Sequence, residues 1–171
     1  DLLALETAGA RRTRAETLAS LKEALAKAEA DLQHMFENGG RAEALMAARS
    51  ALYDSLISGL LDHASLHKFP AANPTKGEVL TAAAVGGYGR GELAPHSDID
   101  FLFLQPVKVS PRSEQVIEYV LYMLWDLGLK VGQAVRTPDE CVRMAKSDQT
   151  IATALLEARH LWGDTDQFEE M

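Results

Sequence analysis

The 171-residue chain has little cysteine and little basic charge, and it has no long apolar run. Cys141 is its single cysteine, so no intrachain disulfide can form, as is usual in a reducing compartment such as the cytoplasm. Lysine and arginine number 17 against 25 acidic residues, and the net charge of −8 disfavours nucleic acid and anionic membranes as partners. No apolar run approaches the roughly 18 residues of a transmembrane helix, and no signal peptide is visible. We therefore expect a cytoplasmic protein without a nucleic-acid or membrane partner.

The remaining composition is typical of a soluble globular domain. Hydrophobic residues make up 47% of the chain and charged residues 25%, which excludes disordered, collagen-like and disulfide-scaffold proteins. At roughly 100–200 residues per domain, the length predicts one domain, with room for a helical extension. Because the chain begins at Asp1 and not at methionine, we expect it to be part of a longer protein.

Two helices are predicted in the first third of the chain. Apolar residues recur at helical spacing over 18–35, and Asn38-Gly39-Gly40 is expected to end this helix. A second apolar stripe covers 45–60, and the short break between the two stripes favours an antiparallel hairpin. Pro70 and Asn73-Pro74 should then end the helices. We assign residues 1–70 to an N-terminal helical region.

Strands and helices alternate over residues 78–171, which we assign to the core of the domain. Apolar runs predict three strands, over 79–85, 99–104 and 129–136. Capping residues and a terminating glycine predict helices over 111–127, from 138 onward and over 148–160. This alternation predicts an α/β or α+β sheet packed by helices.

A glycine-rich segment directly follows the first predicted strand. Four glycines fall within residues 86–91, and such a turn exposes backbone N–H groups and lets an anion approach the main chain. Arg90 adds a fixed positive charge whose planar donors suit phosphate. The glycine spacing is not the dinucleotide fingerprint, and no Walker lysine is present, so the two common nucleotide-binding folds are disfavoured.

Asp98 and Asp100 stand two residues apart at the start of the second predicted strand. Strand periodicity places both carboxylates on one face. Two carboxylates held close together are tolerated when a divalent cation lies between them, and Mg²⁺ prefers one or two such ligands together with phosphate oxygens. Taken singly, the glycine turn and the aspartate pair also fit a tight turn and a solvated loop end. Their order and spacing favour metal-assisted phosphoryl or nucleotidyl transfer.

Gly86-Gly87 followed by Ser97-Asp98-Ile99-Asp100 resembles the signature of the polymerase-beta-type nucleotidyltransferase superfamily. The fuller string over 85–100 resembles that of the bacterial PII uridylyltransferase/uridylyl-removing enzyme family, and two later blocks, over 124–137 and 152–159, agree with it. The resemblance covers roughly residues 79–164.

This resemblance implies an α+β fold, a mixed sheet with flanking helices, preceded here by the helical hairpin. It implies that Gly86, Gly87, Arg90 and Ser97 bind the phosphates of the nucleotide, and that Asp98 and Asp100 are the catalytic pair that holds Mg²⁺. UTP would donate UMP to a tyrosine of the PII signalling protein, with release of pyrophosphate. Family enzymes continue with a hydrolase domain and with glutamine-sensing ACT domains, so glutamine is the expected effector of the full-length enzyme.

Two departures from the family pattern keep alternatives open. Gln133-Ala134 stand where members usually carry histidine and serine, and the strand over 129–136 lacks the third carboxylate of many superfamily members. The first alternative is another nucleotidyltransferase of the superfamily, such as an adenylyltransferase acting on a protein or a small molecule. The second is a catalytically degenerate, nucleotide-binding regulatory domain.

The sequence also predicts the surroundings of two further side chains. Arg136 can reach a phosphate if the third strand lies beside the second, and a structural ion pair is the competing role. Cys141 lies within a predicted helix and is expected to be in the core or semi-buried.

Overall fold

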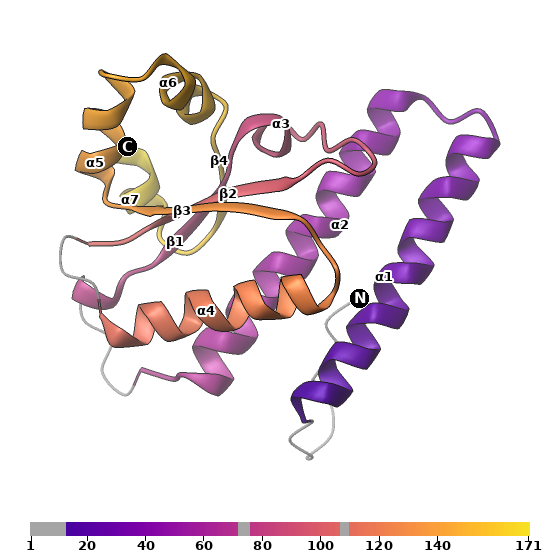
Figure 1. The fold of residues 1–171 in the computed structure, drawn as a ribbon, viewed down its shortest axis with the longest axis horizontal. Coiled ribbons are helices and arrows are strands. Elements are labelled where there is room, and N and C mark those ends of the chain that lie inside the picture. The colour runs from indigo at the N-terminus through magenta and orange to yellow at the C-terminus, as the bar shows by residue number, and fades with distance from the viewer. Residues whose placement is uncertain (1–12, 72–75, 107–109) are drawn as a thin grey trace.

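The computed structural model describes residues 13–71, 76–106 and 110–171 (Figure 1). Its helices and strands follow in the order α1 (Arg14–Glu37), α2 (Ala42–Asp62), β1 (Thr81–Ala84), α3 (Gly86–Gly89), β2 (Ile99–Leu104), α4 (Pro111–Asp126), β3 (Val131–Arg136), α5 (Pro138–Ala145), α6 (Gln149–Leu156), β4 (Arg159–Trp162) and α7 (Thr165–Glu169). A π-helical turn, His63–Lys68, extends α2, and a 3-10 turn spans Lys76–Glu78. The predicted turn at Asn73-Pro74 lies outside the described residues. None of the described helices has the length and apolar character needed to cross a membrane.

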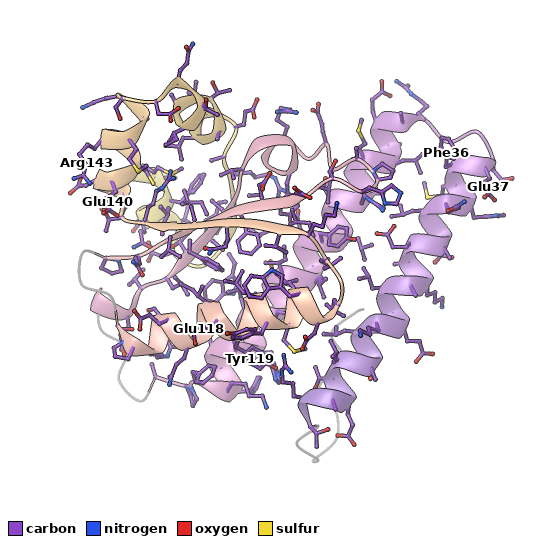
Figure 2. The ribbon with its side chains drawn as sticks, in the orientation of Figure 1. Phe36, Glu37, Glu118, Tyr119, Glu140 and Arg143 are labelled. Carbon is purple, nitrogen blue, oxygen red and sulfur yellow. The ribbon has the colours of Figure 1, made fainter. Side chains whose placement is uncertain are left out.

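Helices α1 and α2 form the predicted antiparallel hairpin, with α1 on the outer side of α2 (Figure 1). A capping box begins α1, and Asn38 caps its C-terminus at the predicted stop. Leu21 and Leu25 are buried, whereas Met35 is 44% exposed. The apolar stripe predicted for this helix is therefore buried only in its first half. The second half extends past the core, and Figure 2 shows Phe36 and Glu37 at its end.

In the described part of the chain, four strands form one mixed sheet in the order β3-β2-β1-β4. β1 pairs antiparallel with both β2 and β4, and β2 pairs parallel with β3. The parallel register places Asp100 opposite Gly132, and Leu104 opposite Arg136. The prediction of a mixed sheet with flanking helices is confirmed.

Alternate residues of β2 face two different cores, as the two-residue period of a strand requires. Phe101 and Phe103 are buried in the larger core with α2 and α4. Leu102 and Leu104 form a smaller cluster with Cys141 of α5, which is fully buried as expected. Asp100 shares the face of Leu102, so its carboxyl lies on the side of the sheet that α5 and α6 cover.

The larger core also joins the helical hairpin to the sheet. Leu21 of α1 and Leu56 of α2 belong to the same buried cluster as Phe101 of β2 and Val120 of α4. The described parts of the predicted N-terminal helical region, residues 1–70, and of the predicted core region, residues 78–171, therefore pack directly on each other. The hairpin supplies one wall of the larger core and covers the face of the sheet that carries Phe101 and Phe103.

The last part of the chain departs from the helix predicted over 148–160. α6 ends at Leu156, and β4 begins at Arg159 and pairs with β1. Gly163 then follows with a φ of 95°, and a Cβ atom there would overlap the carbonyl oxygen of Leu80. The prediction was wrong here because β4 depends on partners far away in the sequence. A further short helix, α7, follows this strand.

Candidate active site

The glycine-rich segment forms α3, a helix of four residues directly after β1. Gly86 has a φ of 59°, in the left-handed region that favours glycine. A Cβ atom at Gly89 would overlap backbone oxygens of Glu157 and Ala84. Glycine is therefore required at the first position for its conformation and at the last for its close packing.

The start of α3 offers backbone donors beside the sheet. Its N-cap residue is Val85, whose side chain makes no capping hydrogen bond. Because the first N–H groups of a helix have no acceptor within that helix, the amides that begin α3 suit an anion such as phosphate. Gly86 also lines the same cleft as Asp100.

Tyr88 anchors α3 to the body of the domain. Its side chain is buried, and its hydroxyl donates a hydrogen bond of 2.6 Å to Asp54 of α2. Arg159 of β4 donates to both carboxylate oxygens of Asp54, at 2.8 and 3.0 Å, and also to the carbonyl oxygens of Tyr88 and Gly89. Burial and the hydrogen bond to Asp54 raise the pKa of Tyr88 above its usual range, so the hydroxyl remains a donor. These contacts fix the glycine turn between α2 and β4.

Asp98 and Asp100 lie on either side of Ile99 at the start of β2. Ile99 is buried in the larger core, whereas both aspartates are exposed. The carboxylates therefore lie away from the core side that Ile99 occupies, as the strand period predicts. Partial burial raises the pKa of Asp100, and the nearby negative charge of Asp98 raises it further. The two carboxylates are thus close enough to repel each other, which is the arrangement that a cation relieves.

Gly132 of β3 leaves the space in which the Asp100 carboxyl lies. A Cβ atom at Gly132 would overlap Oδ1 of Asp100. Two aspartate carboxylates with this freedom fit Mg²⁺, which completes its shell with water and substrate phosphate oxygens. The described residues contain no group of three or more histidine, cysteine, aspartate or glutamate side chains that could hold a metal ion. The pair therefore fits Mg²⁺ as two of its ligands.

A cleft of about 290 Å³ begins at Gly86 and Asp100 and runs between the sheet and α6. Its sheet side includes Gly132, Ala134 and Arg136 of β3. Its helix side consists of Thr150, Ile151, Ala154 and Leu155 of α6. Asp100 therefore lies in a cleft whose walls are largely apolar.

Arg90 and Ser97, which the sequence suggested as phosphate ligands, lie outside the lining of this cleft. Nε of Arg90 is 2.7 Å from Glu92, and its Nη1 is 2.8 Å from Glu157. Its positive charge is therefore already balanced by two carboxylates. Ser97 lines a separate cavity of about 480 Å³ between the helical hairpin and the loop before β2. Phosphate binding by these two residues stays a prediction.

Two of the other predicted residues, Gly86 and Asp100, line one cleft. Gly87 follows Gly86 directly in the chain, and Asp98 precedes Asp100 by two residues. Sequence reasoning did not find the role of Gly132. The available signal was an isolated glycine inside a predicted strand, which often marks a close approach. The contact of Arg159 with Asp54 had no local signal, because the two residues lie far apart in the sequence.

A mixed sheet that presents an aspartate pair beside a glycine turn defines a nucleotide-transferring class of domain. The family described as "Nucleotidyltransferase domain" matches residues 66–158, more than half of the chain, and the chain belongs to this family. The superfamily resemblance inferred from the sequence is thereby confirmed.

Curated relatives narrow the similarity to one kind of enzyme. The chain is 52% identical over 155 residues to the bifunctional uridylyltransferase/uridylyl-removing enzyme of Rhodospirillum rubrum. It is 50% identical over 160 residues to the enzyme of that name from Azospirillum brasilense, and 50% identical over 158 residues to the one from Caulobacter vibrioides. These matches cover 90%, 94% and 92% of this chain but only 17% of each relative. The chain therefore spans about one sixth of the length of these relatives.

Proposed function

We propose that this domain transfers UMP from UTP to a tyrosine hydroxyl of the PII signalling protein, with Mg²⁺ as cofactor and with release of pyrophosphate. The observation that carries the proposal is the Asp98 and Asp100 pair beside the glycine turn, with Gly132 making room for one of the two carboxyls. The choice of a uridylyl group is supported by the similarity to relatives named uridylyltransferases.

The proposed roles of the residues follow from where each lies. Asp98 and Asp100 hold Mg²⁺, which supplies positive charge to the phosphate oxygens when it is bound. The amides that begin α3 bind phosphate oxygens, and the anchored Tyr88 keeps α3 in place. Gly132 leaves room for the Asp100 carboxyl in the cleft. The chain thus supplies donors at α3 and acceptors at the aspartate pair around one reacting phosphate.

In the proposed reaction, the tyrosine oxygen forms a bond to the α-phosphorus of UTP. The bond between that phosphorus and the bridging oxygen breaks, and pyrophosphate leaves with the electron pair. The hydroxyl proton passes to solvent. Glutamine is the proposed effector in the full-length protein, and the cytoplasm is the proposed site of the reaction.

The direct test incubates the full-length protein with PII, Mg²⁺ and each of the four ribonucleoside triphosphates in turn. The mass of intact PII is then measured. We expect the mass of one uridylyl group to be added per modified tyrosine with UTP, and no addition with the Asp100→Asn variant. An adenylyl adduct formed from ATP would instead indicate an adenylyltransferase. Nucleotide binding without any adduct would indicate a degenerate regulatory domain, and either result would overturn the proposal.

A further inference from the structure

Arg136, the last residue of β3, is the one cationic side chain among the residues that line the cleft. Every other arginine side chain in the described part of the chain forms an ion pair or donates to a backbone carbonyl. The side chain of Arg136 makes no such contact within the same residues. A guanidinium carries five N–H donors, so those of Arg136 are available to a ligand in the cleft.

The sheet places Arg136 at the opposite end of the cleft from the phosphate-binding elements. Alternate residues of β3 share one face, so Arg136 lies on the face of Gly132 and Asp100. Arg136 lies four positions after Gly132, which is about 13 Å of strand. Gly86 follows β1, which pairs with the other edge of β2 from β3. The glycine turn and Arg136 therefore approach the aspartate pair from opposite sides.

With this arrangement, the phosphates and the base of a bound nucleotide lie at different ends of the cleft. Phosphates bound at α3 and at the aspartate pair leave the opposite side of the reacting phosphate to the ribose and the base. A nucleoside monophosphate and an extended arginine side chain together span the distance from Asp100 to the backbone of Arg136. The group that Arg136 meets is thus the end of the nucleotide that is farthest from the phosphates.

The walls of the cleft suit a planar ring. Leu102 and Ala134 line it from the sheet, and Ile151, Ala154 and Leu155 line it from α6. Its volume of about 290 Å³ lies just below the range of small-molecule sites, which is about 300–1,000 Å³. Such a space admits a nucleobase more readily than a loop of a folded protein. The base is therefore the occupant that its size, walls and position favour.

We propose that Arg136 determines the preference for UTP by donating hydrogen bonds to a carbonyl oxygen of uracil. The inference rests on the proposed function, because the ring must belong to the nucleotide donor. Uracil presents a carbonyl oxygen where cytosine presents an amino group. A guanidinium only donates hydrogen bonds, so it pairs with the carbonyl of uracil and leaves the amino group of cytosine unpaired. Arg136 therefore distinguishes the two pyrimidines at the position where they differ.

The test compares UTP with CTP as donors for PII modification by the full-length protein. For wild type, Arg136→Ala and Arg136→Glu, kcat/KM is measured with each nucleotide, and circular dichroism checks the fold. Arg136→Ala should lower the UTP to CTP ratio by about tenfold or more, because a charge-assisted hydrogen bond is lost. Arg136→Glu should shift the preference further toward CTP, since a carboxylate accepts from the cytosine amino group.

Arg143 provides a matched control. It lies on the next helix, α5, where its side chain is 74% exposed and only 3.8 Å from Glu140, and Figure 2 shows it on the outer side of that helix. The Arg143→Ala variant should keep the wild-type ratio of UTP to CTP. It removes an equal charge from the same region without touching the cleft.

Three results would overturn the role of Arg136. The UTP to CTP ratio could stay at the wild-type value in folded Arg136 variants. KM could rise equally for both nucleotides, which would indicate a phosphate contact. KM could rise for PII alone, which would indicate an acceptor contact. A wild-type protein that transfers no nucleotide contradicts the proposed function instead, and calorimetric titrations with UTP and CTP then measure the role of Arg136 independently of transfer.

Discussion

Gly132 and Asp100 face each other across the parallel strands β3 and β2, and the carboxyl of Asp100 occupies the space where another residue would carry its Cβ atom. A glycine inside a strand often marks a place where another group approaches the backbone closely. The position of one acidic side chain in the candidate site is therefore set by a glycine on the neighbouring strand. Altering that glycine changes the site without removing any of its charged groups.

The Gly132→Ala variant should lose transfer activity but not stability. The added methyl group displaces the end of an exposed side chain, and a displacement of about 1 Å at a reacting centre can cost about 100-fold in rate. The fold should tolerate the change, because only a flexible carboxyl has to move. Transfer rates of the full-length variant and urea unfolding of the variant chain measure the two effects separately.

Gly89→Ala is the contrasting variant. A Cβ atom there would meet backbone oxygens of Glu157 and Ala84, which cannot rotate away. We expect it to lower the free energy of unfolding by about 1–3 kcal/mol, as overpacking usually does. If Gly132→Ala transferred UMP at the wild-type rate, the space beside Asp100 would have no role in activity.

Asp98→Asn and Asp100→Asn should each abolish transfer while leaving the fold intact. Each variant removes one of the two charges proposed to hold Mg²⁺, and lost transition-state contacts of this kind cost about 100-fold or more in rate. Because each also relieves the repulsion between neighbouring carboxylates, the melting temperature should not fall. Turnover assays with circular dichroism as the fold control check both statements. Near-wild-type transfer in both variants would remove the pair from the mechanism.

The sequence predicted those parts of the fold that have local signals. The strand over 99–104 and the helix from Pro111 to its stop before Gly128 both match the structure, because apolar runs, caps and glycines mark their ends. β4 was missed because its residues gain their order from pairing with β1 and from the contact of Arg159 with Asp54. Such long-range contacts leave no trace in local periodicity.

The sequence predicted the acidic and glycine residues of the candidate site, but it could not predict which arginine side chains form ion pairs. Spacing alone indicated that Asp98 and Asp100 share a face and that glycines precede them. Spacing could not indicate that Arg90 pairs with both Glu92 and Glu157. Glu157 directly follows α6 and is far from Arg90 in the sequence. That Arg136 has no ion pair among the described residues was equally hidden, since it depends on which carboxylates the fold brings near.

The Tyr88→Phe variant should destabilise the domain. Its buried hydroxyl donates to the Asp54 carboxylate at 2.6 Å, and a hydrogen bond to a charged group contributes about 1.5–3 kcal/mol. Arg159 remains to pair with Asp54, so we expect a loss near the lower end of that range. Urea unfolding measures this loss, and Tyr122→Phe serves as the control because Tyr122 is 55% exposed. Equal unfolding midpoints for the two variants would contradict the anchoring role of Tyr88.

Cys141 should react slowly with a thiol reagent in the native chain and rapidly after unfolding. Its side chain is fully buried against Leu102 and Leu104, and burial raises the pKa of the thiol. A raised pKa lowers the thiolate fraction at every pH below it, and the thiolate is the reactive form. At pH 8 we expect modification by a chromogenic disulfide to be at least about 100-fold faster in concentrated urea. Unfolding exposes the side chain and also returns the pKa of the thiol toward its ordinary value. Since the chain has one cysteine, the rate of modification reports only on the packing of α5 against the sheet. Equal rates in buffer and in urea would show that α5 does not cover this face of the sheet in solution.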